Sequence, residues 1–190
     1  ISGLEKAVAF TEKARALGLG VCGFHTYLQN NMIPFEDLRA GYKTDEMFKL
    51  IQSESLEASK YMAKYLGECE LTLGSGQRNA SLRAIAPTKS TALIMGGVSE
   101  GINPFPANSY TQKTPAGEVQ RINPTLLKLM KNKKIDTEEH FEEIILNQGS
   151  VQDVLWLNDE EKKVFRTAFE IDQNVIMRLA AKRQKYLDQL

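Results

Sequence analysis

Pro87 to Gly97 reads PTKSTALIMGG and follows an apolar run, Leu82 to Ala86. This order predicts a strand, a turn and then a short helix closed by Gly96 and Gly97. With Thr88 as the N-cap, the next three backbone N–H groups have no partner inside the helix, and the positive end of the helix dipole lies behind them. Such a corner can bind an anion, phosphate above all. The alternative is an ordinary capped turn whose N–H groups face water.

Composition indicates a globular protein or a piece of a larger one. The chain has 190 residues, of which 42% are hydrophobic and 25% charged. Lys plus Arg and Asp plus Glu both number 24, so no net field attracts nucleic acid or an anionic membrane. No apolar run approaches the roughly 20 residues that cross a bilayer, and the N-terminus has no signal-peptide pattern. We therefore expect a cytoplasmic protein with no membrane or nucleic-acid partner.

Two weak motifs lie near the N-terminus. Residues 18–23, GLGVCG, match the dinucleotide pattern G-x-G-x-x-G, but they follow a predicted helix where that pattern needs a strand. Close passage of packed backbones is the favoured interpretation of these glycines. Cys22 and His25 share a helical face without further ligands nearby, so no metal site is predicted.

Apolar spacing and capping residues predict mostly helices, with three short strand regions. The predicted helices are Leu4–Leu17, Phe24–Asn30, Thr44–Leu66, Pro124 to about Asn132, Asp136 to before Gly149, and Asn158 to Leu187 with a break near Asp172. The predicted strands are Leu19–Cys22, Leu82–Ala86 and a hairpin over Tyr110–Ile122 that turns at Pro115–Gly117. So few strands close no sheet by themselves, which indicates that the sheet or barrel is completed by chain that is not present here.

Three runs carry a resemblance to a known family. They are GLGVCGFHTYLQ (18–29), GQRNASLRAIAPTKSTALIMGGVSEGINPFPANSY (76–110) and FEIDQNVIMRLAAKRQKYLDQ (169–189). They resemble the C-terminal half of the catalytic barrel of the class I ribonucleotide reductase large (alpha) subunit. The resemblance implies part of a ten-stranded α/β barrel, mostly helical in this segment. It also implies that residues 1–190 form half of one domain without an inner boundary.

The resemblance assigns a role to the opening stretch. In that family the corresponding strand, loop and helix hold the diphosphate of a ribonucleoside diphosphate, largely through backbone amides. The implied substrate-binding residues here are Pro87, Thr88, Lys89, Ser90 and Thr91. The implied reaction is reduction of ribonucleoside diphosphates to deoxyribonucleotides for DNA synthesis. Lys89 departs from the small or acidic residue expected at its position.

The chemistry of that family needs a radical cysteine in an N-x-C-x-E pattern and a further redox cysteine pair. Cys22 and Cys69, the two cysteines of the chain, lie in neither context. We interpret both as structural or incidental and expect no catalytic residue, no metal and no cofactor bound by this segment.

The same resemblance implies partners outside the sequence. They are the remaining part of the large subunit, the small (beta) subunit with its metal-radical cofactor, thioredoxin or glutaredoxin as dithiol reductant, and ATP or dNTP effectors bound elsewhere. The alternative hypothesis is a non-catalytic interaction module that retains the reductase scaffold.

Overall fold

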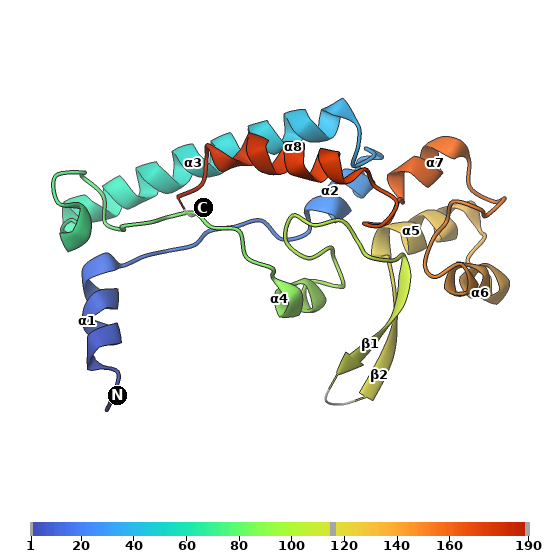
Figure 1. Cartoon of the computed structure of the whole chain (residues 1–190), viewed down its shortest axis with the longest axis horizontal. Coiled ribbons are helices and arrows are strands. Elements are labelled where there is room, and N and C mark those ends of the chain that lie inside the picture. The colour runs from blue at the N-terminus through green and yellow to red at the C-terminus, as the bar shows by residue number, and fades with distance from the viewer. Residues whose placement is uncertain (1, 115–116, 189–190) are drawn as a thin grey trace. The chain divides into compact units, whose positions relative to one another are not determined.

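The computed structural model describes residues 2–114 and 117–188. The chain packs as two units, which we describe separately (Figure 1). Unit 1 comprises residues 1–20, 42–86 and 179–190, and unit 2 comprises residues 21–41 and 87–178. Two helices, α3 (Leu38–Leu66) and α8 (Gln173–Gln184), each begin in unit 2 and end in unit 1. The expectation of one domain stays a prediction.

Unit 1 contains α1 (Glu5–Ala14), the 3-10 turn η1 (Glu70–Thr72) and two extended segments that run parallel. The Leu19 N–H donates to the Leu82 carbonyl at 2.8 Å, and the Ala84 N–H donates to the Leu19 carbonyl at 3.1 Å. The predicted strands Leu19–Cys22 and Leu82–Ala86 are therefore too long, because the described residues contain only one bridge here, between Leu19 and Arg83. Neither segment has a further strand beside it among those residues.

The close approach of these segments explains the glycines at 18 and 20. A Cβ added at Gly20 would lie 2.5 Å from the Ala84 carbonyl oxygen, well inside van der Waals contact. One added at Gly18 would lie 3.1 Å from the Ala84 Cβ. A side chain at position 20 would force the two segments apart. The interpretation that these two glycines allow packed backbones to pass closely is therefore confirmed.

The predicted start of α3 at Thr44 is wrong. The helix begins at Leu38, where the Asp37 carboxylate accepts the Arg39 N–H at 2.7 Å. Asp37 therefore caps the helix almost two turns before Thr44, which is fully buried in the helix interior. A good cap at the earlier position outweighs the presence of Gly41 inside the helix.

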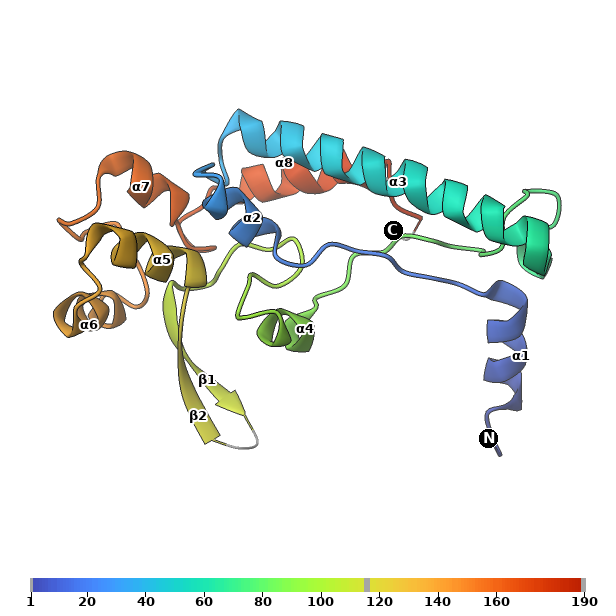
Figure 2. The same ribbon diagram turned by 180° about the vertical axis from the view of Figure 1, so that it is seen from behind.

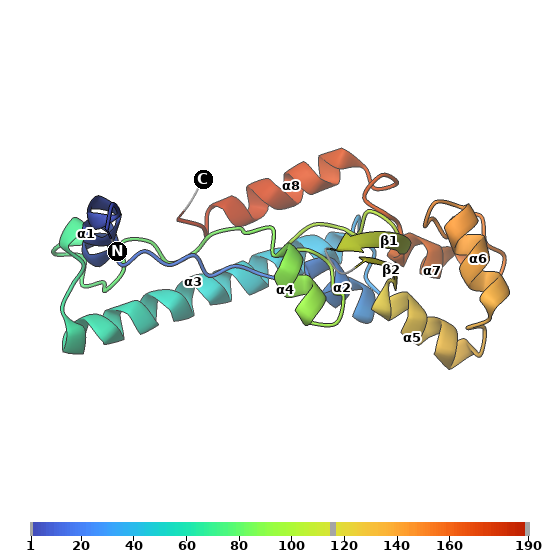
Figure 3. The ribbon, with the colours of Figure 1, turned by 90° about the horizontal axis from the view of Figure 1, so that it is seen from below.

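Unit 2 contains a hairpin and a group of short helices. Strands β1 (Ser109–Thr114) and β2 (Gly117–Ile122) pair antiparallel with Ser109 opposite Ile122, which confirms the arms of the predicted hairpin. Of the predicted turn, residues 115 and 116 lie outside the described residues. The helices are α2 (Phe24–Asn30), α4 (Lys89–Ile94), α5 (Pro124–Lys133), α6 (Glu138–Leu146) and α7 (Asp159–Val164). Helices α5, α6 and α7 lie together (Figure 2 and Figure 3).

Helix caps in unit 2 follow the sequence closely. The Asn123 side chain accepts from two N–H groups of the first turn of α5, and Asn158 forms a capping box with Glu161 at the start of α7. The predicted cap at Asp136 is wrong by one residue, because Thr137 caps α6 through the His140 N–H. The last predicted helix is interrupted over residues 165–172, a longer break than expected.

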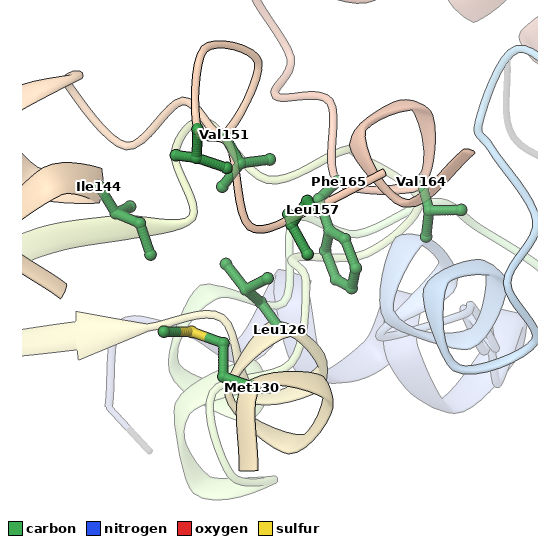
Figure 4. Packing of buried hydrophobic residues seen from close by; sticks show 8 residues of the cluster. Leu126, Met130, Ile144, Val151, Leu157, Val164 and Phe165 are labelled. Atoms are coloured by element: carbon green, nitrogen blue, oxygen red, sulfur yellow. The ribbon is translucent and has the colours of Figure 1, made fainter. Parts of the chain in front are cut away.

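The core of unit 2 joins α5, α6 and α7 (Figure 4). Its eight buried side chains are Leu126, Met130, Ile144, Val151, Val154, Leu157, Val164 and Phe165. Their burial stabilises a frame to which the hairpin connects directly through Asn123. Among the described residues, no helix is both long and apolar enough to cross a membrane.

Candidate functional site

The five residues expected to bind a diphosphate lie in unit 2 at the start of α4 (Figure 1). Thr88 is half-buried, whereas Pro87 before it and the first three residues of the helix are exposed. These residues are thus the turn before α4 and the first three residues of that helix, and all of them except Thr88 are exposed. We call residues 87–91 the α4 loop.

The backbone of the α4 loop offers free donors. The Thr88 carbonyl accepts the Ala92 N–H at 2.8 Å, which places Thr88 at the N-cap position as predicted. Within the described part of the chain, no acceptor contacts the N–H groups of Lys89, Ser90 and Thr91. These three groups belong to one helical turn, so they can bind a common anion.

The side chain of Thr88 does not behave as a helix cap. It makes no bond to an N–H group of α4, and its backbone has φ 53° and ψ 28°, the left-handed conformation. That conformation costs a non-glycine residue about 1–3 kcal/mol and persists only where neighbouring contacts hold it. The predicted N-cap position is thus confirmed, and the Thr88 side chain leaves the N–H groups of the first turn free.

Two contacts hold the Thr88 hydroxyl instead. It accepts the Gly101 N–H at 2.8 Å and donates to the Cys22 sulfur at 3.3 Å. The Cys22 thiol in turn lies 4.0 Å from the Ser99 carbonyl oxygen, as its donor. Cys22 is therefore part of the support of the α4 loop, in agreement with a structural role. No set of three or more His, Cys, Asp or Glu side chains in the described residues could hold a metal.

Residues 99–101 form the other side of this support, and they cap α2. The Ser99 and Gly101 carbonyls accept the N–H groups of Gly23 and Phe24 at 2.9 and 3.0 Å. The Ser99 hydroxyl accepts the Thr26 N–H at 3.2 Å, and the Thr26 hydroxyl accepts the Ser99 N–H at 2.8 Å. The sequence carries no local signal for these bonds, because the partners lie more than 70 residues apart.

His25 is held in the interior of unit 2 by a hydrogen bond and by ring contacts. Its Nδ1 accepts the Phe105 N–H at 3.0 Å, and its ring lies edge-on to Phe35 with centroids 5.3 Å apart. Burial disfavours the charged imidazolium and lowers the pKa of His25 to about 3. The neutral ring is therefore a packing element near neutral pH.

Cys69 has a structural position in unit 1. It is fully buried, and its thiol lies 3.0 Å from the Lys13 carbonyl oxygen and 3.2 Å from that of Ala14. Both carbonyls belong to the last turn of α1, which has carbonyl groups without helical partners. The thiol thus joins the loop after α3 to the end of α1.

Comparison with known proteins identifies the family. The model of the ribonucleotide reductase barrel domain matches residues 2–72 and 70–190. The chain belongs to the ribonucleotide reductase barrel-domain family. The α4 loop therefore lies in a ribonucleotide reductase α/β barrel fold, and the extended segments 17–20 and 81–86 are consistent with neighbouring strands of it.

Individual relatives agree with this family. A solved structure, the class Id ribonucleotide reductase alpha subunit of Actinobacillus ureae, is 45% identical, with a TM-score of 0.89 over 99% of this chain and 34% of that one. The ribonucleoside-diphosphate reductase large subunit of invertebrate iridescent virus 3 is 37% identical over 98% of this chain and 30% of its own length. A frog virus 3 relative is 40% identical over 97% of this chain and 32% of its own length. The chain thus spans about a third of the length of each of these three relatives.

Proposed function

We propose that this chain is part of the large subunit of a ribonucleoside-diphosphate reductase and supplies its substrate-diphosphate corner. The observation that carries the proposal is the set of free N–H groups on Lys89, Ser90 and Thr91 at an exposed helix start. Family membership supports the reaction, which would convert ribonucleoside diphosphates to deoxyribonucleotides for DNA synthesis.

The contribution of this segment would be positioning. A fixed diphosphate holds the ribose of the substrate against a radical cysteine supplied by another part of the large subunit. Holding reactants in place converts an encounter into an intramolecular step, which accounts for a large share of many enzymatic rate enhancements. Neither cysteine of this chain takes part, since Cys22 supports the α4 loop and Cys69 is buried in unit 1.

The proposal includes partners and cofactors that other polypeptides or segments would hold. They are the remaining part of the large subunit, a small (beta) subunit with a metal-radical cofactor, and thioredoxin or glutaredoxin as the dithiol reductant. ATP or dNTP effectors would bind to another part of the large subunit. The chain has equal numbers of acidic and basic residues, so we propose that it has no nucleic-acid partner. We also propose a cytoplasmic location.

The test removes one of the converging donors. Ser90→Pro deletes an N–H group at the second position of α4, where proline is tolerated within the first helical turn. A hydrogen bond to a charged group is worth about 1.5–3 kcal/mol, so we expect KM for the nucleoside diphosphate to rise about tenfold or more. The measurement is steady-state kinetics of the intact large subunit with its small subunit.

Glu160→Pro is the matched control. Glu160 also occupies the second position of a short helix, α7, and its side chain is exposed. Proline at this position strains the preceding backbone in the same way, but it does so outside the α4 loop. KM for the nucleoside diphosphate should therefore stay unchanged. Equal KM values for Ser90→Pro and the parent enzyme would overturn the diphosphate assignment.

A further inference from the structure

The hydroxyl of Thr88 has no hydrogen left for a phosphate. A hydroxyl group carries one hydrogen to donate and two lone pairs that accept. The Thr88 hydrogen is directed to the Cys22 sulfur, and one lone pair accepts the Gly101 N–H. A phosphate oxygen is an acceptor and needs donors. Thr88 therefore differs from the residues that follow it, whose N–H groups are free.

The position of Thr88 in the backbone explains what its hydroxyl can do. Its left-handed φ and ψ set the direction in which the chain enters α4, and hence where the N–H groups of the first turn point. A strained residue keeps such a conformation only if its surroundings fix it. In Thr88 the fixing contacts are those of the hydroxyl to the buried Gly101 and to Cys22.

The partners of Thr88 are themselves held firmly. Gly101 and the fully buried Ser99 cap α2 through the bonds to Gly23, Phe24 and Thr26. The Thr88 hydroxyl thus attaches the exposed α4 loop to a buried, fully bonded part of unit 2. Losing this hydroxyl would leave the buried Gly101 N–H without an acceptor, which is costly.

We infer that Thr88 is a positioning residue of the α4 loop and does not bind the diphosphate through its side chain. Its hydroxyl fixes the loop to Gly101 and Cys22, whereas the free N–H groups of Lys89, Ser90 and Thr91 contact the diphosphate. This inference rests on the proposed function of the loop. Of the five expected substrate-binding residues, Thr88 thus supports the loop, while Lys89, Ser90 and Thr91 contact the substrate.

The kinetic test compares Thr88→Val with Thr88→Ser in the intact large subunit. Valine keeps the shape of threonine but removes the hydroxyl, whereas serine keeps the hydroxyl. We expect Thr88→Val to raise KM for the nucleoside diphosphate about tenfold while kcat changes less than about twofold, since only substrate binding is weakened. Thr88→Ser should restore KM to within about twofold of the parent value.

A second measurement needs no substrate. In the ligand-free protein, hydrogen exchange at the Gly101 amide should become at least about tenfold faster in Thr88→Val and stay near the parent rate in Thr88→Ser. A side chain that only touched the diphosphate would leave this exchange unchanged. Raised KM with unchanged Gly101 exchange would therefore overturn the inference in favour of direct contact.

Cys22→Ala provides a variant that leaves Thr88 in place. Because sulfur is a weak acceptor, we expect KM to rise only about two- to threefold, again with little change in kcat.

Unchanged KM and unchanged Gly101 exchange in both Thr88→Val and Cys22→Ala would overturn the inference. If the nucleoside diphosphate fails to slow exchange at Lys89, Ser90 and Thr91 of the parent enzyme, the proposed function fails, while the Gly101 exchange still tests the role of Thr88.

Discussion

His25 shows how the interior of unit 2 constrains a single residue. Its ring is fully buried against Phe35 and Phe105, and its Nε2 has no hydrogen-bond partner within the described residues. A buried imidazole ring can remain without a partner for this nitrogen while it is neutral. Burial strongly disfavours the charged imidazolium, which loses its contact with water. The free energy of unfolding should therefore depend on pH through this residue.

We predict that acid destabilises the protein through His25. The folded-state pKa is lowered from 6.5 to about 3, so between these values the unfolded chain binds a proton that the folded chain does not. The free energy of unfolding then falls as pH falls below about 6.5, by up to about 1.4 kcal/mol per pH unit. His25→Gln, whose amide oxygen can accept the Phe105 N–H, should reduce this slope in urea unfolding between pH 6.5 and pH 4.5.

The control for this prediction is His140→Gln. It removes the other histidine of the chain, which is only partly buried at the start of α6, and it should preserve the slope. A parent protein and a His25→Gln variant with the same pH dependence would contradict the assigned cause.

At the scale of elements, the extended segment 81–86 that leads toward the α4 loop is held by Asp188. Its carboxylate accepts the N–H groups of Leu82 and Arg83 at 2.7 and 3.0 Å and pairs with the Arg83 guanidinium. The Arg83 side chain is 8% exposed and Asp188 is 26% exposed. The Asp188 carboxylate thus accepts two backbone N–H groups that a neighbouring strand would otherwise bind. It also neutralises the positive charge of the buried Arg83 side chain.

We predict that Asp188→Ala destabilises the protein by about 2–3 kcal/mol. Removing one partner of a fully buried pair costs about 3–5 kcal/mol, and the partial exposure of Asp188 reduces that figure. The measurement is the free energy of unfolding in urea at neutral pH. Glu46→Ala, which breaks an exposed pair with Lys43, is the control and should have little effect. Similar losses in the two variants would show that Asp188 has no special role.

Elements with local signals could be predicted from the sequence, whereas those fixed by distant contacts could not. Asn123 and Asn158 cap helices with donors two or three residues away, so their spacing alone revealed them. Thr88 occupies the same kind of position, but its hydroxyl is taken by Gly101 and Cys22, which the fold brings to it. The candidate site therefore stays a prediction from the sequence, while the contacts that support its loop could only come from the structure.

At the scale of the whole chain, many large apolar side chains remain exposed. In unit 2 they include Ile94 at 87%, Leu155 at 95% and Phe169 at 87% exposure. Each of these side chains leaves most of its apolar surface open to water, and burial of that surface against another segment would be favourable. The chain spans only about a third of its ribonucleotide reductase relatives, and we expect other segments of a large subunit to cover part of these residues.

We predict that the isolated chain does not reduce ribonucleoside diphosphates, because its sequence has no cysteine in the N-x-C-x-E pattern that would carry the radical. Reduction should appear when a polypeptide with that cysteine and the allosteric domain is added, together with a small subunit, a dithiol reductant and an effector nucleotide. The measurement is deoxyribonucleotide formation from a labelled substrate. Turnover by this chain alone would contradict the division of labour proposed here. Failure of every mixture would favour the non-catalytic interaction module, since that alternative shares the exposed apolar residues but requires no chemistry.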